Sequence, residues 1–392
     1  MTKDKEKLSR NLKLLVGTNI INNILFLFLN TFFIAYFYTL TNYDYKIISI
    51  YYIFVYVVVG LTFWLLGDIV KTKNKLIVYR LGIVLHCAYI LIIALLKENI
   101  LQYYILLGAF YGFIQGTYWS GGHTLINQET EGAKTTKYVS AVAIIGKMAK
   151  IIFPIVFGTS IELTSFSNIA LYVLILSLTQ FTLSLFITDK SDKDNNFNLI
   201  KYMKYVRDSG AKVKHYYKII FYEGIVKNLL ETLIVIVIIM TFKSSMNLGI
   251  LTTIFSICSM ITVYVFQKFY KEKEPKKLLY ICALVSVISV ALLVCDISKI
   301  TVVAYNFINS IFMVILYNYS NIKRYNCINT DKLKEFTVEH QAMSDVYLAI
   351  SRVLGYFVLF VTSFFNTIIP FKILLVVISI CIVRYTKLLS KV

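Results

Sequence analysis

The chain has 392 residues, of which 58% are hydrophobic and 16% charged, with a mean hydropathy of +0.71 and a formal net charge of +19. A soluble domain carries about 25% charged residues and intersperses them with apolar ones, so this composition excludes an ordinary soluble protein. Apolar runs of about twenty residues, the length that crosses a hydrocarbon core, recur along the whole sequence. The composition therefore predicts a polytopic membrane protein.

Twelve apolar segments follow one another along the chain, in two groups of six. They are continuous rather than alternating, so helices, which satisfy their own backbone groups in lipid, are the expected form. The first segment follows a basic start and is too long for a signal-peptide core, so we expect a retained helix. The N-terminal bundle (1–188) has segments near 14–40, 46–67, 76–96, 100–122, 138–161 and 167–188; a polar linker (189–217) follows; the C-terminal bundle (218–392) has segments near 219–242, 247–267, 278–295, 300–319, 337–365 and 370–390.

The basic residues lie on alternate loops. With the N-terminus inside, 31 of the 40 Lys and Arg residues fall on cytoplasmic segments, five on outside loops and four within apolar runs. This bias is the positive-inside rule, and shifting the helix count by one would destroy it. We therefore expect a multi-pass protein of the cell membrane with both termini and the linker in the cytoplasm. Because the positive charge reports topology, it does not indicate a nucleic-acid partner.

The two halves have the same order of apolar segments and basic loops. Their first helices start about 202 residues apart, and the basic loop GDIVKTKNK (67–75) has a counterpart in KFYKEKEPKK (268–277). Two six-helix halves of the same orientation are typical of a parallel internal repeat. In architecture the chain resembles the major facilitator superfamily of secondary transporters over nearly its whole length.

Two short motifs add to this resemblance. In the loop after the second segment, Asp68 and the lysines from Lys71 onward match the family's signature in kind, although Trp64 stands where its first glycine is expected. In FPIVFG, Pro154 and Gly158 match half of a fifth-helix signature of drug antiporters. The resemblance implies two six-helix bundles related by a pseudo-two-fold axis, alternating access, and a gating role for Asp68 and Lys71.

The fifth segment, YVSAVAIIGKMAKIIFPIVFG, contains Lys147 and Lys150. They lie about nine and twelve residues into the helix, roughly 14 and 18 Å from its start, and share one face. A charge near mid-bilayer is costly and usually faces a cavity or a partner. Lys147 could instead extend its ammonium to the interface. Lys150 is too deep for this, so we expect it to face an aqueous cavity.

The seventh and eleventh segments carry further deep charges. Glu223, Lys227 and Glu231 are spaced i, i+4, i+8 along one stripe, which fits either a structural Glu–Lys–Glu ladder or a protonatable site centred on Glu231. Asp345 and Arg352 are seven residues apart on one face. Arg352, which keeps its proton, could anchor a carboxylate or phosphate or form a structural pair with Asp345. Glu231, Glu223 and Asp345 are thus the candidate proton-coupling residues.

Polar and aromatic residues complete the predicted cavity. In the family, the helices with the deep charges face the central cavity or the seam between the halves, and the first and fourth segments add Asn23, Asn30, Gln115 and Trp119. Several cations beside amides and aromatics suit an amphipathic substrate with negative charge. The leading hypothesis is a proton-coupled secondary transporter that acts as a monomer in the lipid bilayer.

Two alternatives remain open. One is a flippase of the same fold that moves a lipid or lipid-linked glycan, which would differ by a gap between the halves that opens sideways to lipid. The other is a membrane-embedded sensor or enzyme. The four histidines and six cysteines make no metal spacing or nucleophile motif, and the linker is too short for a catalytic domain, so we expect no enzyme activity, metal or other cofactor.

Overall fold

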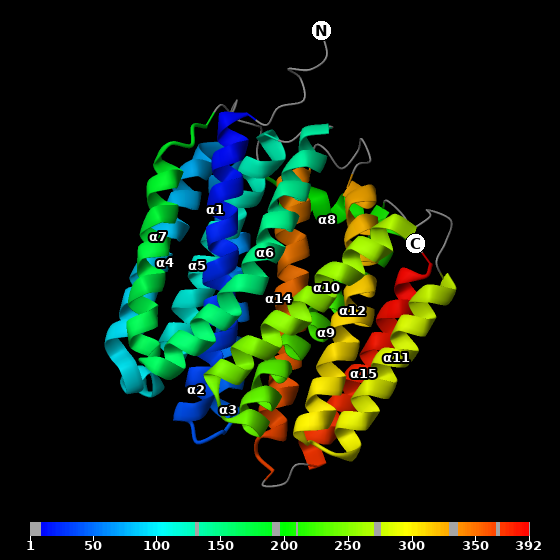
Figure 1. Ribbon diagram of the computed structural model, residues 1–392. Coiled ribbons are helices and arrows are strands. Elements are labelled where there is room, and N and C mark those ends of the chain that lie inside the picture. The colour runs from blue at the N-terminus through cyan, green and yellow to red at the C-terminus, as the bar shows by residue number, and fades with distance from the viewer. Residues whose placement is uncertain are drawn as a thin grey trace.

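The computed structural model describes residues 9–129, 133–189, 197–208, 211–269, 276–328, 336–365 and 369–391. In these ranges the chain is a bundle of long helices without strands (Figure 1). Eleven helical stretches in the described ranges are long and apolar enough to cross a membrane. The twelfth expected span is the 26-residue α5 (Tyr104–Glu129), whose glycines and polar side chains lower its hydropathy. The all-helical fold of two six-helix bundles is confirmed.

The N-terminal bundle begins with a continuous rod, α1–η2–α2, in which a short π-helical stretch interrupts the α-helix. The π-helical η3 and the 3₁₀ segment η4 likewise continue α3 and α4. The bounds are α1 (Arg10–Leu27), η2 (Phe28–Phe33), α2 (Ile34–Leu40), α3 (Lys46–Ile69), η3 (Val70–Asn74), α4 (Lys75–Leu96), η4 (Lys97–Gln102), α5, α6 (Ala133–Leu163) and α7 (Phe166–Leu185).

The C-terminal bundle contains α9 (Ala211–Phe242), α10 (Ser245–Phe269), α11 (Lys276–Cys295), α12 (Lys299–Ile328), α14 (Thr337–Thr362) and α15 (Ile369–Leu389). The region predicted as a polar linker contains a helix of its own, α8 (Leu199–Asp208), and α9 begins at Ala211 rather than near 219. The start of α1, α8 and the end of α15 lie at the same end of the bundle (Figure 1). We call this end the linker face and the opposite end the far face.

Side-chain caps mark several helix starts. Ser9, Asn74 and Ser165 each accept a hydrogen bond from the amide three residues later, at 3.1, 3.0 and 3.2 Å. Such caps satisfy amides that have no partner within the helix. They place the boundaries of α1, α4 and α7 at the polar residues that separate the apolar runs.

Helix α5 packs between α3 and α4 in the N-terminal bundle. Its glycines allow this close approach: a Cβ on Gly112 would collide with the carbonyl of Val55 on α3. Small residues at helix interfaces are the usual way in which membrane helices bring their backbones together. The polar composition of α5 is therefore compatible with its buried position.

Two helix pairs make most of the contact between the halves: α3 packs against α14, and α6 packs against α10, while α2 also touches α9. The linker helix α8 docks on the C-terminal bundle through Tyr202, which is fully buried. The Tyr202 hydroxyl lies 2.6 Å from the Tyr217 hydroxyl and 2.6 Å from Nδ1 of His340. Aromatic packing and hydrogen bonds thus hold the linker against α9 and α14.

Candidate functional site

The deep charges from both halves meet around the middle of α9. Lys150 of α6 lies within electrostatic range of Glu231 and Lys227, and Lys147 within range of Lys150. Arg352 of α14 and Glu231 both act on the ring hydroxyl of Tyr56, which belongs to α3. The predicted residues Lys147, Lys150, Glu231 and Arg352 are therefore neighbours, although they come from both bundles.

This cluster is accessible to solvent. Lys150 and Glu231 have exposed side chains, whereas Leu230 and Leu233, which flank Glu231 on α9, are 4% and 1% exposed. Because the groups that interact with Glu231 belong to α3, α6, α12 and α14, its exposed surface faces the space between these helices. A charged group within a membrane usually faces a cavity or a partner, and Lys150 and Glu231 face each other across this space.

The cations of the C-terminal half lie over aromatic rings. The Arg352 guanidinium is 4.9 Å from the centroid of Tyr56, and the Lys227 ammonium is 5.6 Å from that of Tyr317. The Nε of Arg352 is buried and has no hydrogen-bond partner in the structure. Asp345 accepts a 2.7 Å hydrogen bond from Gln341, so Asp345 and Arg352 have separate partners. Arg352 thus retains a donor with which an anion could bond.

Three nearly parallel tyrosine rings cross the seam between α3 and α14. Tyr356 stacks on Tyr52 at 4.5 Å and on Tyr56 at 5.7 Å between centroids. Each hydroxyl is bonded: Tyr52 donates to Asn30, Tyr56 accepts from Asn228 at 3.0 Å, and Tyr356 donates to the Asn228 carbonyl. These contacts fix the wall on which Arg352 rests. Because tyrosine and phenylalanine are abundant throughout the sequence, these three rings could not be predicted as part of the site.

The other predicted cavity residues differ in position. The Asn30 amide donates to Tyr111 at 3.1 Å and so connects η2 to α5 as well as to the tyrosine wall. Asn23 donates to Asn19 within α1. The Trp119 indole donates to Gln115 at 3.0 Å within α5. Of these four, Asn30 contacts the seam, while the bonds of the others lie within helices of the N-terminal bundle.

Glu223 lies beside the charged cluster, since Glu223 and Glu231 both act on Tyr317, but it has hydrogen-bond partners of its own. It is 4% exposed and accepts hydrogen bonds from Ser320 of α12 at 2.8 Å and Tyr385 of α15 at 3.5 Å. Although Glu223 and Glu231 share a helical stripe, the two carboxylates have different surroundings: one is enclosed by hydroxyls and the other is accessible to solvent. Glu231 is thus the predicted carboxylate that lies beside Lys150.

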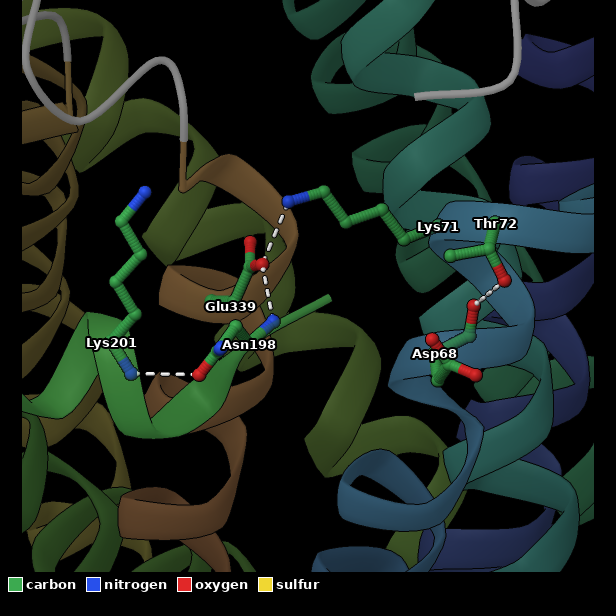
Figure 2. Close-up of polar contacts among 6 residues, drawn as sticks. All are labelled: Asp68, Lys71, Thr72, Asn198, Lys201 and Glu339. Atoms are coloured by element: carbon green, nitrogen blue, oxygen red, sulfur yellow. Dashed lines mark hydrogen bonds and ion pairs between the residues drawn. The ribbon is translucent and has the colours of Figure 1, made fainter. Parts of the chain in front are cut away.

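A second polar contact joins the halves at the linker face. Lys71, just after α3, donates to Oε1 of Glu339 on α14 at 2.7 Å, and both side chains are buried, at 8% and 1% exposure. The same oxygen accepts from the backbone amide of Asn198 at 3.1 Å, and Asn198 in turn caps α8 by accepting from the Lys201 amide (Figure 2). Asp68 is exposed, with its backbone carbonyl bonded to Thr72. The predicted gating lysine is therefore in an inter-half contact, whereas the Asp68 side chain faces solvent.

Comparisons with known proteins bear on this arrangement. Residues 14–323 match the family model described as Major Facilitator Superfamily. The chain belongs to the major facilitator superfamily. Among curated proteins, it is 23% identical over 300 residues to the uncharacterised protein YqgE of Bacillus subtilis (strain 168), which covers 75% of this chain and 69% of that protein.

Solved structures of superfamily members have the same fold. The nucleoside transporter NupG superposes with a TM-score of 0.69 at 13% identity, over 97% of this chain and 98% of NupG. The human organic anion transporter MFSD10 gives a TM-score of 0.64 at 12% identity, over 97% and 99%. At such identities the likeness concerns the fold. As a superfamily member with these apolar helices, the chain is a multi-pass membrane transporter. In the described ranges no group of His, Cys, Asp and Glu side chains could hold a metal ion.

Proposed function

We propose that this protein is a proton-coupled secondary transporter that moves a small amphipathic or anionic substrate across the cell membrane by alternating access. The observation that carries the proposal is the charged cluster between the halves, where Lys150 lies within electrostatic range of Glu231 and of Lys227, with Lys147 beside Lys150 and Arg352 on the same tyrosine as Glu231. This excess of positive charge favours an anion, and the neighbouring tyrosines offer surface for an apolar part. The organic anion transporter MFSD10 shares the fold.

Glu231 is the proposed proton-coupling group. It is the carboxylate beside Lys150, it is accessible to water, and it lies between the halves that alternating access moves against one another. The substrate anion would occupy the cations, and Glu231 would carry the proton. The proton and the anion would then cross together. We propose that the linker face is cytoplasmic, because the basic residues gather there, and that the monomer is the working unit.

Two measurements test the proposal in sequence. A thermal-shift screen of the purified protein against carboxylates, phosphates and lipids identifies a stabilising anion, and Arg352→Gln should abolish that stabilisation. Liposomes that contain the protein and a trapped pH indicator then report proton movement when this anion is added. Anion-dependent proton flux in the wild type that disappears in Glu231→Gln supports the coupling. Anion transport that is indifferent to a pH gradient contradicts it.

Flippase activity is the second candidate. The same cations could bind the headgroup of an anionic lipid while its acyl chains stay in the bilayer. The observation that favours it is the buried Nε of Arg352, which has no hydrogen-bond partner among the described residues and could bond to a headgroup phosphate.

A further inference from the structure

A cavity of about 290 Å³ lies between the two halves at the far face. One wall comes from the end of α2 and the loop that leads to α3, and the opposite wall comes from α9, the end of α14 and the start of α15. Among the described residues that line the cavity, none belongs to the charged cluster in the middle of the bundle. This cavity is therefore a second site, which the proposed transport mechanism does not use.

Aromatic rings form much of the cavity wall. Tyr38 and Tyr43 meet edge to face with 5.5 Å between their ring centroids, and Tyr45 lies 5.8 Å from Phe371 across the seam. Phe365 adds a fifth ring. The face of an aromatic ring has a negative potential and attracts cations, and several rings together form the cages that bind quaternary ammonium groups. The wall is thus suited to an organic cation.

Ammonium groups of the protein itself already lie over aromatic rings at this face. The Lys243 ammonium is 5.6 Å from the centroid of Tyr43, and the Lys46 ammonium is 4.6 Å from that of Phe364. Neither lysine is among the described residues that line the cavity. The rings at this end of the bundle therefore bind ammonium groups at the rim, and the cavity wall has the same chemistry without a lysine.

Asp44 is the charged residue among the described lining of the cavity. Its Oδ1 accepts a 2.8 Å hydrogen bond from the Lys46 amide, and its other oxygen has no hydrogen-bond donor among the described residues. The carboxylate lies within electrostatic range of the hydroxyls of Tyr38 and Tyr45. A carboxylate at this position repels an anion and attracts a cation.

The loop that presents Asp44 has an unusual backbone. Asn42 and Tyr43 have φ angles of 54° and 65°, in the left-handed region. A bulky residue such as tyrosine is rarely found there, because the conformation costs free energy. Hydrogen bonds from the Tyr43 amide to the Tyr38 carbonyl at 3.0 Å and from the Asp44 amide to the Thr41 carbonyl at 3.2 Å maintain it. Strain of this kind is concentrated at sites that hold ligands or change conformation.

The cavity depends on closure of the far face. The Tyr45 hydroxyl donates to the carbonyl of Thr362 at 3.2 Å across the seam. Glu162, at the end of α6, accepts from the amides of Ser245 and Met246 at the start of α10, at 3.0 and 3.3 Å. Alternating access would separate the halves at this face and so move the two walls apart. A ligand that binds between the walls favours the closed conformation, because it binds that conformation better than the open one.

We infer that this cavity binds a small organic cation, an alkylammonium compound whose charged group lies against Asp44 and among the aromatic rings. The bound cation holds the far face closed and thereby inhibits transport. The inference goes beyond the proposed function, because it assigns a ligand of opposite charge to a different cavity.

A thermal-shift titration with choline tests the site. Choline should raise the melting temperature of the purified protein as its concentration increases, whereas its neutral isostere dimethylbutanol should not. Asp44→Asn removes the charge but keeps an oxygen for the Lys46 amide, and it should lower the affinity for choline about tenfold or more. Asp296→Asn is the matched control, because Asp296 is also exposed and at the far face but lies outside the cavity.

Each outcome decides for or against the inference. Equal stabilisation by dimethylbutanol, or an unchanged affinity in Asp44→Asn, overturns the cation site. If Asp44→Asn fails to fold, Met240→Trp, which fills the cavity from α9 without removing a charge, should abolish the effect of choline, and unchanged binding refutes the site.

The pH-indicator assay with liposomes reads transport separately. Choline should inhibit anion-dependent proton flux in the wild type and leave it unchanged in Asp44→Asn. Choline that stabilises the protein but leaves the flux of the wild type unchanged rejects the inhibition. A lack of proton coupling would reject the proposed function and leave the result of the choline titration intact.

Discussion

Replacing Lys71 with methionine should allow the two halves to separate at the linker face. Lys71→Met leaves the Glu339 carboxylate, which is 1% exposed, with the Asn198 amide as its remaining donor among the described contacts. Breaking a buried ion pair by removing one partner costs about 3–5 kcal/mol. Both groups become hydrated when the halves separate at the linker face. The loss of the ion pair therefore destabilises only the conformation in which this face is closed. At 1.4 kcal/mol per tenfold, the open population should rise about a hundredfold or more.

The assay is a distance measurement between the halves. Spin labels at Ile77→Cys on α4 and Lys277→Cys on α11, in a background without native cysteines, report the separation at the linker face by pulsed dipolar spectroscopy. Lys71→Met should shift the distribution to longer distances. Lys75→Met is the matched control, because Lys75 is similarly buried, at 4%, but its 3.2 Å pair with Asp189 joins no helix of the C-terminal half. Equal shifts in both variants, or none in Lys71→Met, would refute a role for this contact in closure.

Three further predictions concern the cavity and the packing. Glu231→Gln should abolish anion transport driven by a pH gradient while leaving anion binding intact in the thermal-shift assay; full gradient-driven transport would rule the role out. Lys150→Met should reduce transport sharply and Lys147→Met less, because Lys147 can reach the interface, and both should melt normally since substitutions of exposed side chains usually change stability little; normal transport by Lys150→Met would mean that its charge is not used. Gly112→Ala should destabilise the protein by about 1–3 kcal/mol through overpacking, seen as lower thermal stability in detergent, and an unchanged melting temperature would show that α5 can move away from α3.

The helices could be predicted from the sequence because hydropathy and charge act locally. Lys134, Lys137 and the central basic stretch separate the apolar runs regardless of what the helices contact, so the twelve segments could be placed before any packing was known. The helices themselves extend into these basic stretches, since α6 begins at Ala133 and α9 at Ala211. The predicted neighbourhood of Lys150 and Glu231 followed from depth alone: two charges at the same level in a bilayer must find water or each other.

The partners of most other residues depend on how each helix is rotated, which one sequence does not reveal. Glu339 lies 268 residues from Lys71, and nothing in either segment signals the pair. Tyr52, Tyr56 and Tyr356 are three of 30 tyrosines. Nothing in the sequence distinguishes these three from the others, so their stacking could not be predicted. The helical stripe that joins Glu223 to Glu231 suggested a shared role, but eight residues at 3.6 per turn place the two side chains about 80° apart around α9, and Glu223 bonds to Ser320.

The carboxylate of Glu162 has a consequence for biogenesis. Helix α10 is the second helix of the C-terminal half, yet two amides of its first turn are satisfied by a residue of the N-terminal half. During synthesis that residue is made some 80 positions earlier, so a partner for the new helix end is already in place when it leaves the ribosome. A gene split within the linker should therefore yield a C-terminal fragment that is degraded when made alone and accumulates when the N-terminal fragment is co-expressed.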